Sequence, residues 1–204
     1  MVYSLNGYFK LVAGLLEKLR RLVRRFIEPV ALAAARVGLT PNATSALGFL
    51  AALLSAFLVV RGRLAFAAVF VLISGFMDVL DGAIARVTGR VTRFGGFLDS
   101  LLDRYSDVVV LSSVIYASLC QLVWGLAAIT GSLLVSYARA RGESLGVKMA
   151  GIGLAERAER LIIITLGLLF NAVNWAVILI AILAHITVGI RAFKAWTCLR
   201  GDRL

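Results

Sequence analysis

Residues 78–103 read DVLDGAIARVTGRVTRFGGFLDSLLD and bring four aspartates into an otherwise strongly apolar chain. If the two ends of this stretch are helical, Asp78 and Asp81 are i,i+3 neighbours on one helix face. Asp99 and Asp103 are i,i+4 neighbours on another. Ionised side chains in a membrane are costly and therefore mark function. Two helices that met on these faces would form a cage of four carboxylates.

The composition of the whole chain is that of a membrane protein. Of its 204 residues 61% are hydrophobic, and the mean hydropathy is +0.94. Soluble domains contain roughly 45–50% apolar residues. The net charge of +11 could attract nucleic acid. In so apolar a chain it is instead typical of cytoplasmic loops that meet anionic lipid headgroups, so we expect membrane lipid and no nucleic acid as a partner.

The first 36 residues form a separate basic segment. Their apolar residues recur every three or four positions, which predicts an amphipathic helix. Because charges interrupt every long apolar run, we expect this helix to lie in the cytoplasmic membrane interface, and not to act as a signal peptide. A solvated basic helix is the alternative. We therefore divide the chain into a juxtamembrane helix, residues 1–36, and a transmembrane domain, residues 37–204.

The transmembrane domain is predicted to be all-α, with six spans of about 20 residues or more. The predicted spans cover residues 43–60, 64–86, 95–119 and 121–137, and two more share 154–190 with a break at 171–174. With six spans, 20 of the 22 Lys and Arg lie on one side, and only Arg61 and Arg63 lie on the other. Basic residues favour the cytoplasm. We therefore expect a multi-pass cell-membrane protein whose termini and aspartates face the cytoplasm.

Four facing carboxylates would repel one another unless cations neutralised them. Hard divalent ions prefer oxygen ligands, so we expect Mg²⁺, with Mn²⁺ as an alternative. The candidate ligands are Asp78, Asp81, Asp99 and Asp103. A pair of ions bridged by these carboxylates could hold both sides of a pyrophosphate during an in-line displacement. Salt bridges to arginines of the same stretch could absorb one or two aspartates, but hardly a regular pair of pairs.

The same stretch matches the pattern D-x2-D-G-x2-A-R-x8-G-x3-D-x3-D at every fixed position. The matching residues are Asp78, Asp81, Gly82, Ala85, Arg86, Gly95, Asp99 and Asp103. In this the chain resembles the CDP-alcohol phosphotransferase family. The resemblance implies that a hydroxyl of an alcohol attacks the β-phosphorus of a CDP-linked alcohol, and that CMP leaves. It also implies a homodimer.

The resemblance also implies roles for single residues. Asp78, Asp81 and Asp99 would hold metal, and Asp103 would be both a metal neighbour and the general base for the incoming hydroxyl. Base action requires that Asp103 be at least partly free of metal. The residues expected to contact the CDP-lipid are Asn42, Asp78, Gly82, Arg86 and Thr92.

The acceptor alcohol is expected to depend on residues of the last three spans. Ser136, Arg139, Arg157 and Arg191 would lie near the aspartates and form a basic pocket for an acceptor that carries phosphate. Anchoring to the inner leaflet is the alternative for these arginines. The segments 136–143, 156–161 and 187–191 resemble those of phosphatidylinositol-phosphate synthases and their archaeal counterparts, in which Lys replaces Arg139 and Gln replaces Ile190.

The resemblance thus implies an enzyme of phospholipid biosynthesis that transfers a phosphatidyl or archaetidyl group to inositol phosphate. The donor would be CDP-diacylglycerol or CDP-archaeol, with its tails in the bilayer. Glycerol 3-phosphate, the acceptor of a phosphatidylglycerophosphate synthase, needs a similar phosphate pocket and is the alternative. A cation transporter would instead distribute acidic residues near mid-membrane over several spans. Here they cluster at one end.

Overall fold

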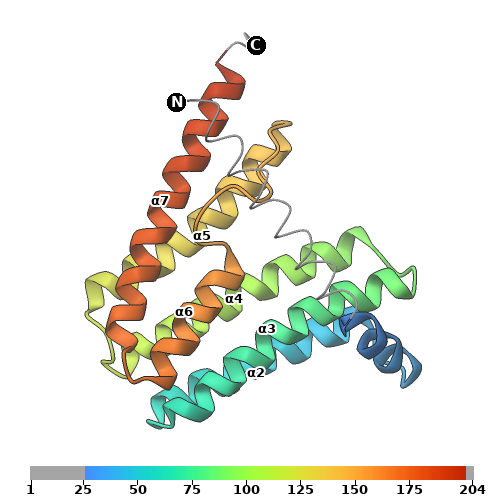
Figure 1. The fold of residues 1–204 in the computed structure, drawn as a ribbon, viewed down its shortest axis with the longest axis horizontal. Helices are drawn as coiled ribbons and strands as arrows, with labels where there is room; N and C mark the ends of the chain where they lie inside the picture. The colour runs from blue at the N-terminus through green and yellow to red at the C-terminus, as the bar shows by residue number, and fades with distance from the viewer. Residues whose placement is uncertain (1–25, 201–204) are drawn as a thin grey trace.

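The computed structural model describes residues 26–200, and their regular secondary structure is entirely helical (Figure 1). A helical segment at 26–36 is followed by α2 (Pro41–Val60), α3 (Leu64–Val87), α4 (Arg93–Tyr116), α5 (Leu122–Ser144), α6 (Arg157–Leu169) and α7 (Val173–Leu199). The all-α prediction is confirmed for this part of the chain. Most bounds agree with the predicted spans to within a few residues, but α5 continues to Ser144, beyond the predicted end at 137, and α7 continues to Leu199, beyond the predicted end at 190.

Within residues 26–200, four helices are long and apolar enough to cross a membrane, namely α2, α3, α5 and α7. The 24-residue α4 is long enough, but its first half carries the acidic and basic residues of the central stretch. The 13-residue α6 is shorter than a full span. The helices therefore support a membrane protein, whereas the count of six spans stays a prediction.

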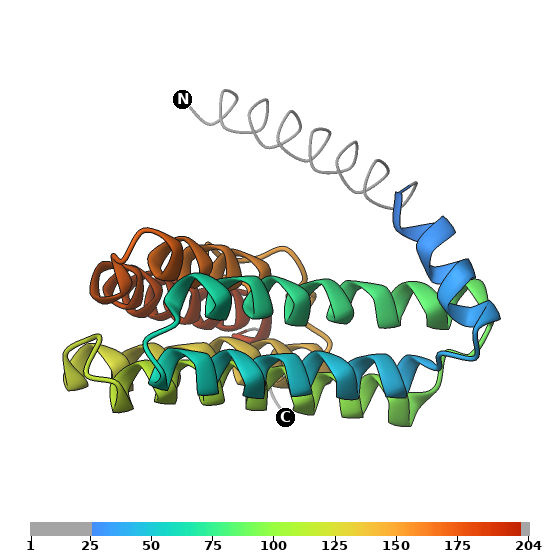
Figure 2. The same cartoon turned by 90° about the horizontal axis from the view of Figure 1, so that it is seen from below.

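Contacts between neighbouring helices close a ring in the order α4, α2, α3, α6, α7, α5 and back to α4. Figure 2 shows the helices running side by side, with α2 and α3 adjacent over most of their length. Small residues allow close approach, as is common between membrane helices. A Cβ atom at Gly48 of α2 would lie 3.1 Å from the Cβ of Met77 on α3. At Gly131 of α5 it would lie 2.9 Å from the Cβ of Ala184 on α7.

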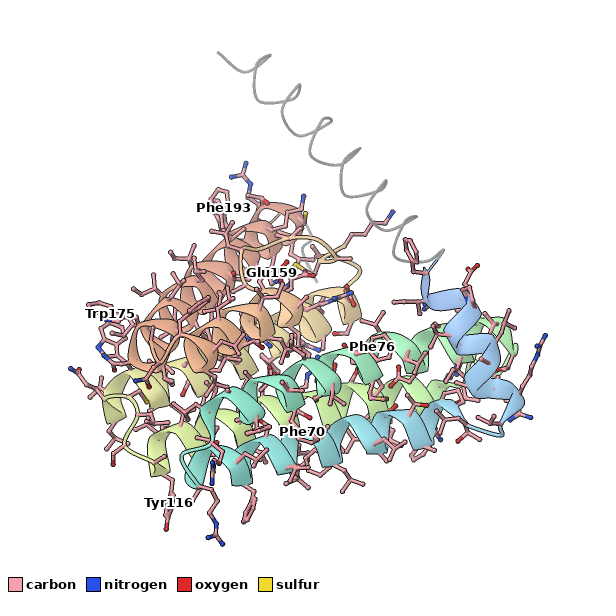
Figure 3. The ribbon with its side chains drawn as sticks, turned by 60° about the horizontal axis from the view of Figure 1, so that its bottom comes forward. Phe70, Phe76, Tyr116, Glu159, Trp175 and Phe193 are labelled. Atoms are coloured by element: carbon pink, nitrogen blue, oxygen red, sulfur yellow. The ribbon has the colours of Figure 1, made fainter. Side chains whose placement is uncertain are left out.

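Apolar side chains cover the outside of the ring as well as its core. Exposed large side chains include Leu50, Phe66 and Leu72. Figure 3 shows Tyr116 and Trp175 pointing away from the helices, and these side chains are 77% and 72% exposed. Both lie at the end of the ring opposite the aspartates, since α4 ends at Tyr116 and α7 begins at Val173. Tyr and Trp side chains, which are amphipathic, are enriched where a bilayer meets water.

The segment at 26–36 packs on the last turns of α3. Ala31 is fully buried in a cluster with Leu80, Ala83 and Ile84. The segment ends before Gly38, which has a φ of +86°, and Thr40 Oγ1 then caps α2 by accepting a hydrogen bond from Ala43 N at 3.3 Å. Gly38 and the Thr40 cap therefore separate this segment from α2. Residues 1–25 lie outside the described residues, so the interfacial helix predicted for 1–36 stays a prediction.

Candidate active site

Three of the four central aspartates converge. Carboxylate oxygens of Asp78 on α3 and of Asp99 and Asp103 on α4 lie within 4.8 Å of one another. Asp81 is buried and lines the same small gap as these three, and its carboxylate also accepts a hydrogen bond from Ser45 Oγ of α2. Residues three apart on a helix differ in direction by about 60°. Asp78 therefore faces α4 while Asp81 faces α2.

Local contacts fix the start of α4, the helix that carries Asp99 and Asp103. Thr92 is the N-cap, and its Oγ1 accepts a hydrogen bond from Gly95 N at 3.0 Å. A Cβ atom at Gly95 would lie 2.9 Å from Thr92 Oγ1 and 3.2 Å from Asn42 Oδ1. The glycine thus allows the N-termini of α2 and α4 to approach closely, next to Asp99.

A cavity of about 220 Å³ lies between the start of α2, the end of α3 and the start of α4. We call it the α2–α4 cavity. Four of the five residues predicted to contact the CDP-lipid line it, namely Asn42, Gly82, Arg86 and Thr92. The fifth, Asp78, lies with Asp99 and Asp103 in a small gap beside it. A Cβ atom at position 82 would come within 3.2 Å of Arg86 Nη1, so the glycine leaves room for that guanidinium.

A second cavity, of about 380 Å³, opens on the other side of the aspartates. We call it the arginine cavity, since its walls include Arg104, Arg139, Arg157, Arg160 and Arg191. All four residues predicted for the acceptor phosphate line it, because Ser136 does so as well. Asp99 lines both this cavity and the α2–α4 cavity. The aspartates therefore stand between two cavities, both lined by basic side chains.

Arg157, the first residue of α6, lies at the border between the aspartates and the arginine cavity. Its Nη1 is 2.8 Å from Asp78 Oδ2 and 2.6 Å from Asp103 Oδ1. The guanidinium therefore neutralises two of the three converging carboxylates. Those carboxylates also fit a divalent metal ion, since they offer closely spaced hard oxygen donors. Arg157 and such an ion would compete for the same oxygens.

Arg191 is only 1% exposed and holds three parts of the protein together. From α7 it donates hydrogen bonds to Val135 O of α5 at 2.6 Å, to Ile152 O at 2.8 Å and to Glu156 Oε1 at 2.9 Å. Since Glu156 directly precedes Arg157, these bonds position the start of α6. Arg139 is different, because it is partly exposed and pairs with Glu143 one turn along α5.

Sequence reasoning gave no role to three residues that the structure brings to the site. Ser45 donates a hydrogen bond from its Oγ to the Asp81 carboxylate. Asp107 and Arg160 form a buried ion pair with 2.5 Å between Arg160 Nη2 and Asp107 Oδ2. Asp107 lies one helical turn beyond Asp103, so continuing the i,i+4 series along α4 would have found it.

The chain matches known proteins in sequence. A profile of the family described as CDP-alcohol phosphatidyltransferase matches residues 38–188. The archaetidylinositol phosphate synthase of Pyrococcus horikoshii is 41% identical over 183 residues, which cover 89% of this chain and 96% of that protein. Residues 38–188 include the aspartates and every residue that lines the two cavities except Arg191.

The fold also matches solved structures. The crystal structure of Mycobacterium tuberculosis phosphatidylinositol phosphate synthase with CDP-DAG bound has a TM-score of 0.78 and 33% identity, and the match covers 88% of this chain and 98% of that one. The same enzyme in complex with manganese and citrate has a TM-score of 0.75 and 34% identity, over 87% and 93% of the two chains. Sequence and fold thus agree over most of the chain.

Proposed function

Because the chain belongs to the CDP-alcohol phosphatidyltransferase family, we propose that it transfers a phosphatidyl or archaetidyl group from a CDP-lipid to inositol phosphate, releasing CMP. The observation that carries this proposal is the arginine cavity, which five arginines and Asp103 line, with Arg157 Nη1 2.6 Å from Asp103 Oδ1. An acceptor that carries its own phosphate needs such a cavity. Two similar proteins, named archaetidylinositol phosphate synthase and phosphatidylinositol phosphate synthase, support the same acceptor.

The CDP-lipid, CDP-diacylglycerol or CDP-archaeol, would lie in the α2–α4 cavity. Asn42, Gly82, Arg86 and Thr92 would contact its nucleotide and phosphates, and Asp78 would lie at the pyrophosphate. Arg86 can form paired hydrogen bonds to phosphate oxygens, and the absence of a side chain at Gly82 lets the ligand approach the α3 backbone. The related enzyme with bound CDP-DAG supports a CDP-lipid as donor.

Asp78, Asp81, Asp99 and Asp103 would hold two divalent ions, Mg²⁺ or Mn²⁺. When bound, these ions would neutralise the charge on the pyrophosphate and on the leaving CMP. The close spacing of three of the carboxylates supports this, as does the manganese complex of the related enzyme. Ser45, by its hydrogen bond, would keep the Asp81 carboxylate oriented toward α2.

Asp103 would act as the general base. It lines both the arginine cavity and the gap that contains Asp78 and Asp99. A carboxylate there can take the proton from the acceptor hydroxyl as the oxygen attacks the lipid-side phosphorus and the bond to CMP breaks. Arg139 and Arg157, with Ser136, would bind the phosphate of the acceptor and orient that hydroxyl. Arg191, also predicted for this role, is buried and would act by holding Glu156 and the start of α6 in place.

We further propose that the protein is a homodimer with six spans in the cell membrane, and that both termini and the site face the cytoplasm. The basic loops on the aspartate side and the exposed Tyr116 and Trp175 at the opposite end support this orientation. A cytoplasmic site would be accessible to a water-soluble sugar phosphate. The lipid tails would reach the site from the bilayer.

The acceptor is tested by a comparison of alcohols. Purified protein is incubated with a CDP-lipid, Mg²⁺ and one acceptor at a time, and CMP release is measured. We expect inositol phosphate to give the highest kcat/KM, and inositol and serine, which lack a phosphate, to give little release. Fastest release with glycerol 3-phosphate would transfer the proposal to that acceptor, and no release with inositol phosphate would overturn it.

A further inference from the structure

A third and much smaller cavity, of about 20 Å³, lies among α3, α4, α5 and α6 on the core side of the aspartates. We call it the serine cavity, because Ser74, Ser106 and Ser132 line it together with Asp107 and Arg160. The rest of its wall is apolar. Arg160 and Asp107 also line the arginine cavity, and Ser74 and Ser106 also line the small gap at the aspartates.

Three side-chain atoms at this cavity have no hydrogen-bond partner in the part of the chain that the structure describes. They are Ser74 Oγ, Ser132 Oγ and Arg160 Nε. The three residues are only 2%, 2% and 5% exposed. A buried polar group without a partner loses its hydration without compensation. All three atoms are buried, so bulk water does not contact them.

We propose that the serine cavity binds a buried water molecule that completes the hydrogen bonding of Ser74, Ser132 and Arg160. A cavity needs roughly 10–15 Å³ on this measure to hold one water, and buried waters make about three hydrogen bonds. The water accepts from Arg160 Nε and bonds both serine hydroxyls, each of which can donate or accept. A metal cation is excluded by the Arg160 guanidinium, and a phosphate or carboxylate is too large.

The position of this water links it to Arg157. The other nitrogens of Arg160 are already committed, with Nη1 donating to Ala155 O at 2.8 Å and Nη2 paired with Asp107. Asp107 Oδ1 in turn lies 3.8 Å from Arg157 Nε. The water would therefore hold the Arg160 guanidinium in place and, through Asp107, position Arg157. The positioning of Arg157 for an acceptor rests on the proposed function, whereas the binding of water does not.

The sign of a stability change tests the proposal. If water bonds Ser132, then Ser132→Ala removes one of its partners and lowers the thermal unfolding midpoint by several degrees. If the cavity is dry, the same change removes an uncompensated hydroxyl and raises the midpoint. Ser113→Ala is the matched control, since Ser113 is also buried and donates a known hydrogen bond to Val110 O at 2.7 Å. An unchanged or higher midpoint for Ser132→Ala, with a lower one for Ser113→Ala, overturns the proposal.

A second measurement uses the unaltered protein and so does not depend on the folding of a variant. Radiolysis of bound water produces hydroxyl radicals that label adjacent side chains, which mass spectrometry detects. We expect labelling of the buried cavity residues Leu111 and Ile164, and not of Val59, which is equally buried but does not line the cavity. If Leu111, Ile164 and Val59 all remain unlabelled, the proposal is overturned. Both experiments omit CDP-lipid and acceptor, so they stand even if the proposed reaction fails.

Discussion

Asp103→Asn is expected to lower the rate of CMP release by about 10³-fold while CDP-lipid binding stays measurable. Asparagine keeps the size of the side chain but cannot take a proton from the acceptor hydroxyl. Asp103 is the aspartate placed to accept this proton, since it lines the arginine cavity and lies beside Asp78 and Asp99. The measurement is single-turnover CMP release at saturating acceptor, together with equilibrium binding of the CDP-lipid.

The matched control is Glu159→Gln, which removes a carboxylate from the exposed surface of the neighbouring α6. Figure 3 labels this residue. It is expected to leave the rate within twofold of the unaltered protein. If Asp103→Asn retains a tenth or more of the normal rate, Asp103 is not the general base. If the same variant loses CDP-lipid binding, Asp103 acts mainly in binding the metal or the CDP-lipid.

Arg157→Ala is expected to raise the KM of inositol phosphate by about 10- to 100-fold, because it removes one charged hydrogen bond to the acceptor. The KM of the CDP-lipid should change much less. The guanidinium lies where the arginine cavity meets the aspartates, so it can reach an acceptor phosphate when it leaves Asp78 and Asp103. Initial rates with each substrate varied in turn measure the two KM values.

Two further variants separate charge from geometry. Arg157→Lys keeps the charge but loses the planar guanidinium, so it should recover only part of the acceptor affinity. Arg139→Ala should raise the acceptor KM less than Arg157→Ala, because Arg139 is partly exposed and pairs with Glu143. Equal increases in the KM of donor and acceptor for Arg157→Ala would show that this residue supports the whole site rather than the acceptor.

Local sequence signals predicted much of the fold. The predicted spans 43–60 and 64–86 agree with the bounds of α2 and α3 to within two residues. Helical spacing also anticipated that Asp99 and Asp103 share a face. The end of α5 was missed, because hydropathy marks where an apolar span ends, whereas this helix continues through its arginines to Ser144.

Contacts between distant segments were beyond the sequence. Nothing local indicates that Arg157 reaches Asp78 and Asp103, since this depends on how α6 packs against α3. The several hydrogen bonds of Arg191 likewise depend on the path of the loop before α6. Spacing alone also suggested a four-membered cage. In the structure all four aspartates line one gap and three of them converge, while the angle between i,i+3 positions lets Asp81 also accept a hydrogen bond from Ser45.

The most direct test of the central claim is the identity of the lipid product. Purified protein in detergent is given a CDP-lipid, Mg²⁺ and inositol phosphate, and lipids and nucleotides are analysed by mass spectrometry. We expect a new lipid with the mass of the donor's phosphatidyl or archaetidyl group joined to inositol phosphate, in equal amount to CMP and absent with Asp103→Asn. CMP without this lipid, or a product made equally by the Asp103→Asn protein, would contradict the account.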